Sequence, residues 1–144
     1  MHVRDVLKSK GGQIISIEPE ATVAEAIARM VQNNIGSLPV VDAQDHLIGI
    51  ISERDLLRGI HNHGEKICGK HVAEFMSRDP VTCELDANVN DVMGQMSERR
   101  IAKVPVLDGA KLVGIVSVGD VIKVLYDNVQ SENQHLMSYI HGSM

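Results

Sequence analysis

The chain has 144 residues, 44% of them hydrophobic, which is enough to bury the core of one domain or of two half-domains that share a core. A net charge of −5 and an aromatic content of 2% provide neither the basic field nor the stacking side chains of a nucleic-acid binder, so we expect no nucleic-acid partner. No apolar run reaches the ~18 residues of a membrane span and the first residues are not a signal peptide, so we predict a cytoplasmic protein without a membrane partner.

The first half of the chain predicts a helix, a strand, a second helix, a hairpin and a third helix. Glu18-Pro19 ends the strand, and Thr22 followed by Glu25 predicts a capping box at the start of the second helix. β-rich runs on both sides of a polar turn indicate the hairpin. In chain order, the predicted elements are the helix Val3–Leu7, the strand Ile14–Ile17, the helix Thr22–Gln32, the strands Leu38–Val41 and Leu47–Ser52, and the helix Glu53–Ile60.

The second half predicts the same order of elements after a polar, glycine-containing linker from Gly59 to Lys70. The predicted elements are the opening helix Val72–Met76, the strand Val81–Cys83, a helix capped by Asn88 with Val89, Val92, Met93 and Met96 on its inner face, and the strands Lys103–Leu107 and Lys111–Ser117. A last helix begins at Ser117 and continues beyond the repeat. Its apolar residues, mostly four apart, are Val121, Leu125, Val129, Leu136 and Ile140. We expect this apolar face to pack on another protein surface, and we interpret it as a dimer contact.

The two halves also match residue by residue. Pro39-Val40 returns 66 residues later as Pro105-Val106, and Gly49-Ile50 returns 65 residues later as Gly114-Ile115. Two copies of one unit predict packing about a pseudo-two-fold axis with paired clefts between them, because each copy alone would leave an apolar face exposed. We predict the first repeat at residues 1–62, a linker at 63–70, the second repeat at 71–125 and a C-terminal helical extension at 126–144.

The sharpest local motif is a glycine-containing strand that leads into a helix start with a serine and an aspartate three residues apart. It occurs as Ser52 with Asp55 and again as Ser117 with Asp120. The unpaired N–H groups and positive dipole of a helix N-terminus suit a phosphate, and the carboxylate can accept hydrogen bonds from ribose hydroxyl groups. The same two residues also form an ordinary helix cap, and that alternative stays open.

The repeated pattern resembles the tandem cystathionine-β-synthase (CBS) domain pair, also called a Bateman module, and is similar to its stand-alone bacterial type. The resemblance rests on the capped helix, the run from Gly36 to Asp42 or its counterpart from Ala102 to Asp108, and the pattern Gly-Ile-x-Ser-x-x-Asp. It implies an α/β (α+β) fold of two β-α-β-β-α repeats packed about a pseudo-two-fold axis. Such pairs bind adenosine-containing ligands (AMP, ADP, ATP, NAD(H) or S-adenosylmethionine) in the clefts between the repeats.

The resemblance also implies roles for individual residues. Asp55 and Asp120 would accept hydrogen bonds from ribose, and Ser52 and Ser117 would donate to phosphate. Backbone and apolar groups would hold the base. The positions expected near the base are Ile15, Ser37, Leu38, Pro39, Val81, Thr82, Lys103, Val104 and Pro105.

The two copies differ in charge. Arg54 places a cation beside the first motif, where the second has Gly119, whereas Arg100 and Lys103 replace neutral residues of the first copy. We therefore hypothesise two unequal sites, or one longer ligand such as NAD whose pyrophosphate uses both cationic groups. Solvated surface arginines are the alternative.

Four further metal-ligand types lie in and beside the linker, at His61, His63, Cys68 and His71. Their spacing matches no zinc module, so we predict no metal site there. Cys68 and Cys83 also lack the spacing of a disulfide framework, which agrees with a reducing compartment.

These observations predict a non-enzymatic sensor of adenine nucleotides, a homodimer that signals in trans to an effector protein. Two other classes remain as alternatives: an adaptor module whose clefts bind no ligand, and a nucleotide-hydrolysing enzyme. No catalytic residues are predicted, because no histidine pairs with a serine in a repeated motif and no P-loop is present.

Overall fold

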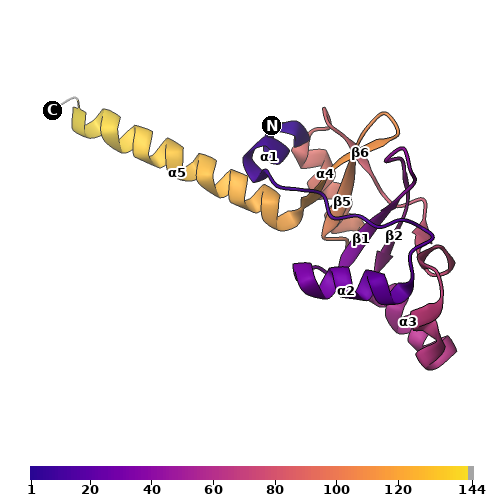
Figure 1. Ribbon diagram of the computed structural model, residues 1–144. Helices are drawn as coiled ribbons and strands as arrows, with labels where there is room; N and C mark the ends of the chain where they lie inside the picture. Colours follow the sequence, from indigo (N-terminus) through magenta and orange to yellow (C-terminus); the bar gives the residue numbers. More distant parts are fainter. Residues whose placement is uncertain (143–144) are drawn as a thin grey trace.

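The computed structural model describes residues 1–142, which form two similar lobes and a long helix that extends away from them (Figure 1). Residues 143 and 144, the end of the predicted extension, lie outside the described residues. The helices are α1 (Val3–Lys10), α2 (Val23–Asn33), α3 (Glu53–His63), the 3₁₀ helices η1 (Gly64–Gly69) and η2 (Val72–Glu74), α4 (Val89–Arg99) and α5 (Val118–Gly142). The strands are β1 (Ser37–Val41), β2 (Leu47–Ser52), β3 (Ser77–Arg78), β4 (Cys83–Glu84), β5 (Lys103–Asp108) and β6 (Lys111–Ser117).

The predicted repeat is visible in two three-stranded sheets, ordered β1-β2-β3 and β4-β5-β6. Both hairpins have the same register, with Ser37 opposite Ser52 in the first and Lys103 opposite Ser117 in the second. Equivalent positions also make the same parallel contact, because Ile17 bridges to Val40 and Cys83 pairs with Val106. The predicted fold class of two packed β-α-β-β-α repeats is confirmed.

The strands predicted at the start of each repeat are shorter than expected. Of Ile14–Ile17, only Ile17 pairs, through its N–H to Pro39 O at 3.0 Å and its carbonyl to Val41 N at 3.0 Å. The residues before it run past the edge of the sheet without a strand beside them. In the second repeat the pairing begins at Cys83 rather than Val81, after Pro80, which has no N–H to donate.

The segment expected to be a polar linker is ordered and partly buried. α3 continues to His63 and η1 follows it directly, with Ile67 only 1% exposed in the core of the first lobe. Gly59 is buried against Ile67, where a side chain on the glycine would collide. Ile67, a buried apolar residue of the linker, therefore fixes this turn, and the opening helix predicted after it is reduced to the 3₁₀ turn η2.

The helix caps follow the sequence closely. Thr22 accepts a hydrogen bond from Glu25 N at 3.2 Å, and Asn88 accepts one from Asn90 N at 2.8 Å. The capping box predicted at Thr22 is half formed: within residues 1–142, Glu25 N donates to the Thr22 hydroxyl, but Thr22 N makes no reciprocal hydrogen bond to the Glu25 carboxylate. Val89, Val92 and Met96 of α4 are buried as predicted.

The two repeats exchange their opening segments. Val3 and Val6 of α1 belong to the core of the second lobe, whereas Val72 and Met76 belong to the core of the first. Glycines in β2 and β6 permit this crossing. A Cβ on Gly49 would lie 2.7 Å from Ser77 O, and a Cβ on Gly114 would lie 2.8 Å from Leu7 Cδ1.

The predicted last helix forms as one continuous element, α5. Its first turns pack on the second lobe through Val118, Val121 and Val124. Beyond them it extends away from both lobes (Figure 1). Among the described residues, no helix is both long enough and apolar enough to cross a membrane.

Candidate functional site

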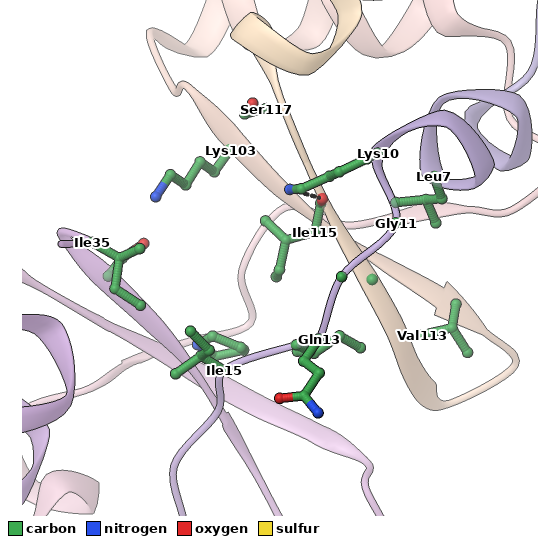
Figure 2. Close-up of a pocket in the computed structure, with 15 residues that line it drawn as sticks. Leu7, Lys10, Gly11, Gln13, Ile15, Ile35, Lys103, Val113, Ile115 and Ser117 are labelled. Atoms are coloured by element: carbon green, nitrogen blue, oxygen red, sulfur yellow. Dashed lines mark hydrogen bonds between the residues drawn. The ribbon is translucent and has the colours of Figure 1, made fainter. Parts of the chain in front are cut away.

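A cavity of about 340 Å³ lies between the two repeats. It brings together Ile15, Ser37 and Pro39 of the first repeat with Lys103 and Ser117 of the second. Figure 2 shows Ile15 and Ile35 of the first repeat on one side of this space and Lys103, Ile115 and Ser117 of the second on the other. Its volume falls within the range of small-molecule sites, at the lower end.

The walls of the cavity are largely aliphatic. Side chains from the opening segment and from both hairpins line it, namely Leu7, Ile14, Ile15, Ile35, Val113 and Ile115. Gly11 and Gly12, which have positive φ angles of 62° and 89°, carry the chain past the cavity and bring main-chain groups to its edge. A flat heterocyclic base can stack between aliphatic side chains while backbone groups bond its edge.

The polar end of the cavity is the start of α5. Ser117 N donates to Asp120 Oδ2 at 3.0 Å, and Asp120 N donates to Ser117 Oγ at 3.0 Å. The Ser117 hydroxyl accepts in this cap, and a hydroxyl can also donate one hydrogen bond. The N-terminus of a 25-residue helix adds its positive dipole at the same point, which suits an anionic group.

Lys10, at the end of α1, reaches into this polar end. Its Nζ donates to Ile115 O at 2.9 Å, the dashed contact in Figure 2, and lies 2.9 Å from Asp120 Oδ2. Burial alone would raise the pKa of Asp120, but hydrogen bonds from Lys10 and Ser117 outweigh it and hold that pKa below its usual value. Within residues 1–142, the bonds to the Asp120 carboxylate all end on Oδ2, which leaves Oδ1 for another donor.

Sequence reasoning missed Lys10, Gly11, Gly12 and Gln13 as cavity residues. The Gly11-Gly12 dipeptide, a few residues after the helix predicted to end at Leu7, is a turn signal that could have indicated this segment. Nothing local pointed to the pairing of Lys10 with Asp120, because the two residues are distant in the sequence and belong to different repeats.

The first motif has the same cap but different surroundings. Asp55 is only 8% exposed, and its Oδ2 accepts from Ser52 N at 2.8 Å and from Ser52 Oγ at 3.0 Å. Its Oδ1 accepts from Ser77 Oγ at 3.1 Å. Both oxygens are therefore occupied by this chain. Asp55 lies on a separate, more open hollow with Arg58 and Glu74.

The remaining predicted site residues lie elsewhere. Leu38 and Val104 are 0% exposed, so their side chains belong to the core and only their backbone can face a ligand. The other predicted residues that do not line the cavity between the repeats are Ser52, Arg54, Arg100, Val81, Thr82, Pro105 and Asp120, of which Asp120 lies beside the cavity, bonded to its lining residues Lys10 and Ser117. Arg54 and Arg100 are exposed, and Arg100 ends α4 in the left-handed conformation with φ 56°.

The CBS domain family model matches the chain twice, over residues 3–62 and 72–127. The chain belongs to the CBS domain family. It is a tandem CBS pair, as the two lobes and the repeated motif also indicate. A curated relative is the mitochondrial CBS domain-containing protein CBSX3 of Arabidopsis thaliana, 34% identical over 97% of this chain and 72% of that protein.

Two solved CBS structures contain adenosine compounds. The CBS domain pair of protein MJ0100, in complex with 5′-methylthioadenosine and S-adenosyl-L-methionine, is 29% identical, with a TM-score of 0.75 over 89% of this chain and 98% of that one. CBSX2 in complex with AMP is 27% identical, with a TM-score of 0.70 over 79% of this chain and 88% of that one.

The cysteines and histidines of this CBS pair do not form a cluster. Among residues 1–142, no group of three or more metal-ligand side chains comes together. Cys68 is exposed, whereas Cys83 is buried, and burial together with the charge of Glu84 raises its pKa to about 11. Cys83 therefore stays a neutral thiol with low reactivity near pH 7.

Proposed function

We propose that this CBS pair is a non-enzymatic regulatory module that binds an adenosine-containing ligand in the cavity between its repeats. The observation that carries the proposal is the cavity itself, which joins aliphatic side chains of both repeats to Ser117, the residue that precedes α5 and bonds to Asp120. The base would lie near Ile15 and Pro39, and the ribose would bond to Asp120. The adenosine compounds bound to MJ0100 and CBSX2 support this ligand class.

Charge at the polar end favours a ligand with phosphate groups. Lys10 and Lys103 both line the cavity, whereas no acidic residue of the described part of the chain does, and Asp120 contacts Lys10 beside it. A phosphate between the two ammonium groups would gain charge-assisted hydrogen bonds, which neutral adenosine lacks. We therefore propose AMP, ADP, ATP or NAD(H) as the regulatory ligand, with no metal required.

The output acts in trans in this proposal, from a cytoplasmic homodimer to an effector protein. Ligand binding regulates an effector only if the ligand prefers one conformational state, typically by ~1–3 kcal/mol. Lys10 is placed for such a change, because a ribose at Asp120 and a phosphate beside Lys10 would both alter the contact that joins α1 to α5.

A thermal-shift panel tests the proposal, with AMP, ADP, ATP, NAD, NADH, adenosine and S-adenosylmethionine added to the full chain. A ligand at ~100 times its Kd adds ~2.7 kcal/mol to stability, which raises Tm by several degrees. We expect a shift with a phosphorylated adenosine and its loss in Lys103→Ala. No shift with any of the seven compounds would contradict the proposal and favour the adaptor alternative. Chromatography of the same mixtures should show ATP and NAD unchanged, and product formation would instead reveal an enzyme.

A further inference from the structure

The outer part of α5 exposes more apolar surface than any other helix of the structure. Tyr126 is 61% exposed, Val129 53% and Leu136 57%, and all lie beyond the turns that pack on the second lobe. The helix leaves the body of the molecule at this point, so neither lobe covers these side chains (Figure 1).

The exposed residues follow a heptad pattern. Ile122, Tyr126, Val129, Asn133 and Leu136 are separated by four, three, four and three residues, which places all five on one stripe of the helix. Ile122, Val129 and Leu136 occupy the d positions, and Tyr126 and Asn133 the a positions. This spacing is that of a seam between two helices, and the exposed apolar residues Leu125, Met137 and Tyr139 lie at the positions that flank it.

A helix of this kind gains little stability alone. Isolated helices are marginal in water, and most helical stability in proteins comes from packing of an apolar face. The sequence of α5 is also a poor match for an isolated helix, because much of its outer part is aromatic, β-branched or polar and uncharged. Pairing along the seam would supply the missing contacts.

Asn133 indicates what the partner is and how it runs. An asparagine at a single a position of a coiled coil is unfavourable against an apolar residue but satisfied against another asparagine, which fixes register and favours a dimer. In a parallel pair of identical helices, Asn133 meets Asn133 of the second copy. In an antiparallel pair, a positions face d positions, and Asn133 would meet Val129 or Leu136.

The charges beside the seam permit this pairing. In a parallel dimer, Glu132 of one helix lies near Met137 of the other, and Leu125 lies near Gln130. No like charges face each other across these flanking positions of α5. We propose that α5 pairs in parallel and in register with α5 of a second copy of this chain, with Asn133 at the centre of the interface.

This inference goes beyond the homodimer proposed above, because it names the interface and its direction and does not depend on any ligand. It also places the two CBS pairs at the same end of the helix pair. A conformational change in one cavity would then be transmitted to the first turn of α5, which contains Asp120.

Disulfide cross-linking of single-cysteine variants tests the arrangement. In a Cys68→Ser background, where only the unreactive Cys83 remains, we would introduce Asn133→Cys, Ile122→Cys and the control Gln134→Cys. Mild oxidation should convert most of the first two to covalent dimers and leave the control monomeric on a non-reducing gel. An antiparallel pair would place the two copies of residue 122 at opposite ends, so the absence of cross-linking at 122 would overturn the proposal.

A second pair of variants tests the energetics on the full chain. Val129→Asp puts a charge in the seam, whereas Ser131→Asp puts the same charge on the outer face. We expect Val129→Asp to lower cross-linking through Asn133→Cys at least tenfold, and Ser131→Asp to leave it unchanged. Equal cross-linking in the two variants would overturn the proposal. The ligand-induced thermal shift should survive in both, which separates failure of this interface from failure of ligand binding.

Discussion

The two Ser-x-x-Asp motifs make the same capping hydrogen bonds, yet their carboxylates lie in different surroundings. Asp55 is buried and receives a neutral hydroxyl from Ser77, whereas Asp120 lies on the edge of a cavity and receives the ammonium group of Lys10. In each case the third partner comes from the opening segment of the other repeat. The local motif forms the cap, and the opposite repeat decides whether the carboxylate is structural or available.

The largest expected difference concerns ligand affinity. Asp120→Asn should weaken binding of a phosphorylated adenosine about tenfold or more, because a hydrogen bond to a charged group is worth about 1.5–3 kcal/mol. Asp55→Asn is the matched control and should change affinity less than about threefold, since Asp55 has no free oxygen. Isothermal titration of both variants checks this. Equal losses in the two variants would show that both motifs bind ligand.

A second difference concerns the paired glycines that let the opening segments cross the sheets. Gly49→Ala should lower the free energy of unfolding by about 1–3 kcal/mol, because the new methyl group meets the backbone carbonyl of Ser77 at 2.7 Å. Gly114→Ala meets only the end of the Leu7 side chain, which can rotate, so we expect a loss below about 1 kcal/mol. Urea unfolding measures both, and a larger loss for Gly114→Ala would contradict this.

Without ligand, the buried carboxylate should matter more for stability than the available one. Asp55→Ala removes the acceptor of Ser52 N and of the Ser77 hydroxyl, and should destabilise the fold by about 1–2 kcal/mol. Asp120→Ala should cost about 1 kcal/mol or less, because Lys10 can be hydrated once its partner is gone. Thermal unfolding of the two ligand-free variants measures both losses. A larger loss of stability for Asp120→Ala than for Asp55→Ala would refute the structural role assigned to Asp55.

The smallest effect is a shift in titration. Lys10→Ala should raise the pKa of Asp120, since burial then acts with less opposition. Because the pKa of Asp120 in the folded wild type is lowered, its contribution to stability is present above the unfolded value and is lost as pH falls through the folded pKa. The stability difference between wild type and Lys10→Ala should therefore be largest near neutral pH and shrink in acid. NMR titration checks the pKa, with Lys8→Ala expected to leave it unchanged.

The sequence was sufficient for everything that depends on short-range pattern. Residue periodicity located both hairpins and the inner face of α4, and the repeated Ser and Asp located both helix starts. The resemblance to CBS pairs correctly implied the pseudo-two-fold fold. Errors occurred where the pairing partner, rather than the segment itself, determines the structure: Ile14 to Ser16 have strand-like composition but no strand beside them.

The cavity was less predictable because it depends on contacts between repeats. Ser37, Lys103 and Ser117 were expected near a ligand and do line it. Leu38 and Val104 were expected there too, but alternation along a strand turns their side chains into the core. Lys10 reaches the site only because α1 crosses to the second lobe, and no local sequence pattern predicts this crossing.

The exchange of opening segments also determines the order in which the elements can fold during synthesis. α1 precedes both lobes in the chain, but the side chains that bury Val3 and Val6 belong to the second lobe, whose buried core extends to Val121. During translation the apolar side chains of α1 stay exposed until the chain up to Val121 has left the ribosome. The first lobe, in contrast, can fold as soon as Val72 and Met76 have emerged. α1 is therefore among the last elements of the two lobes to fold although it is synthesised before them, and a chain interrupted between the repeats would leave α1 without its core.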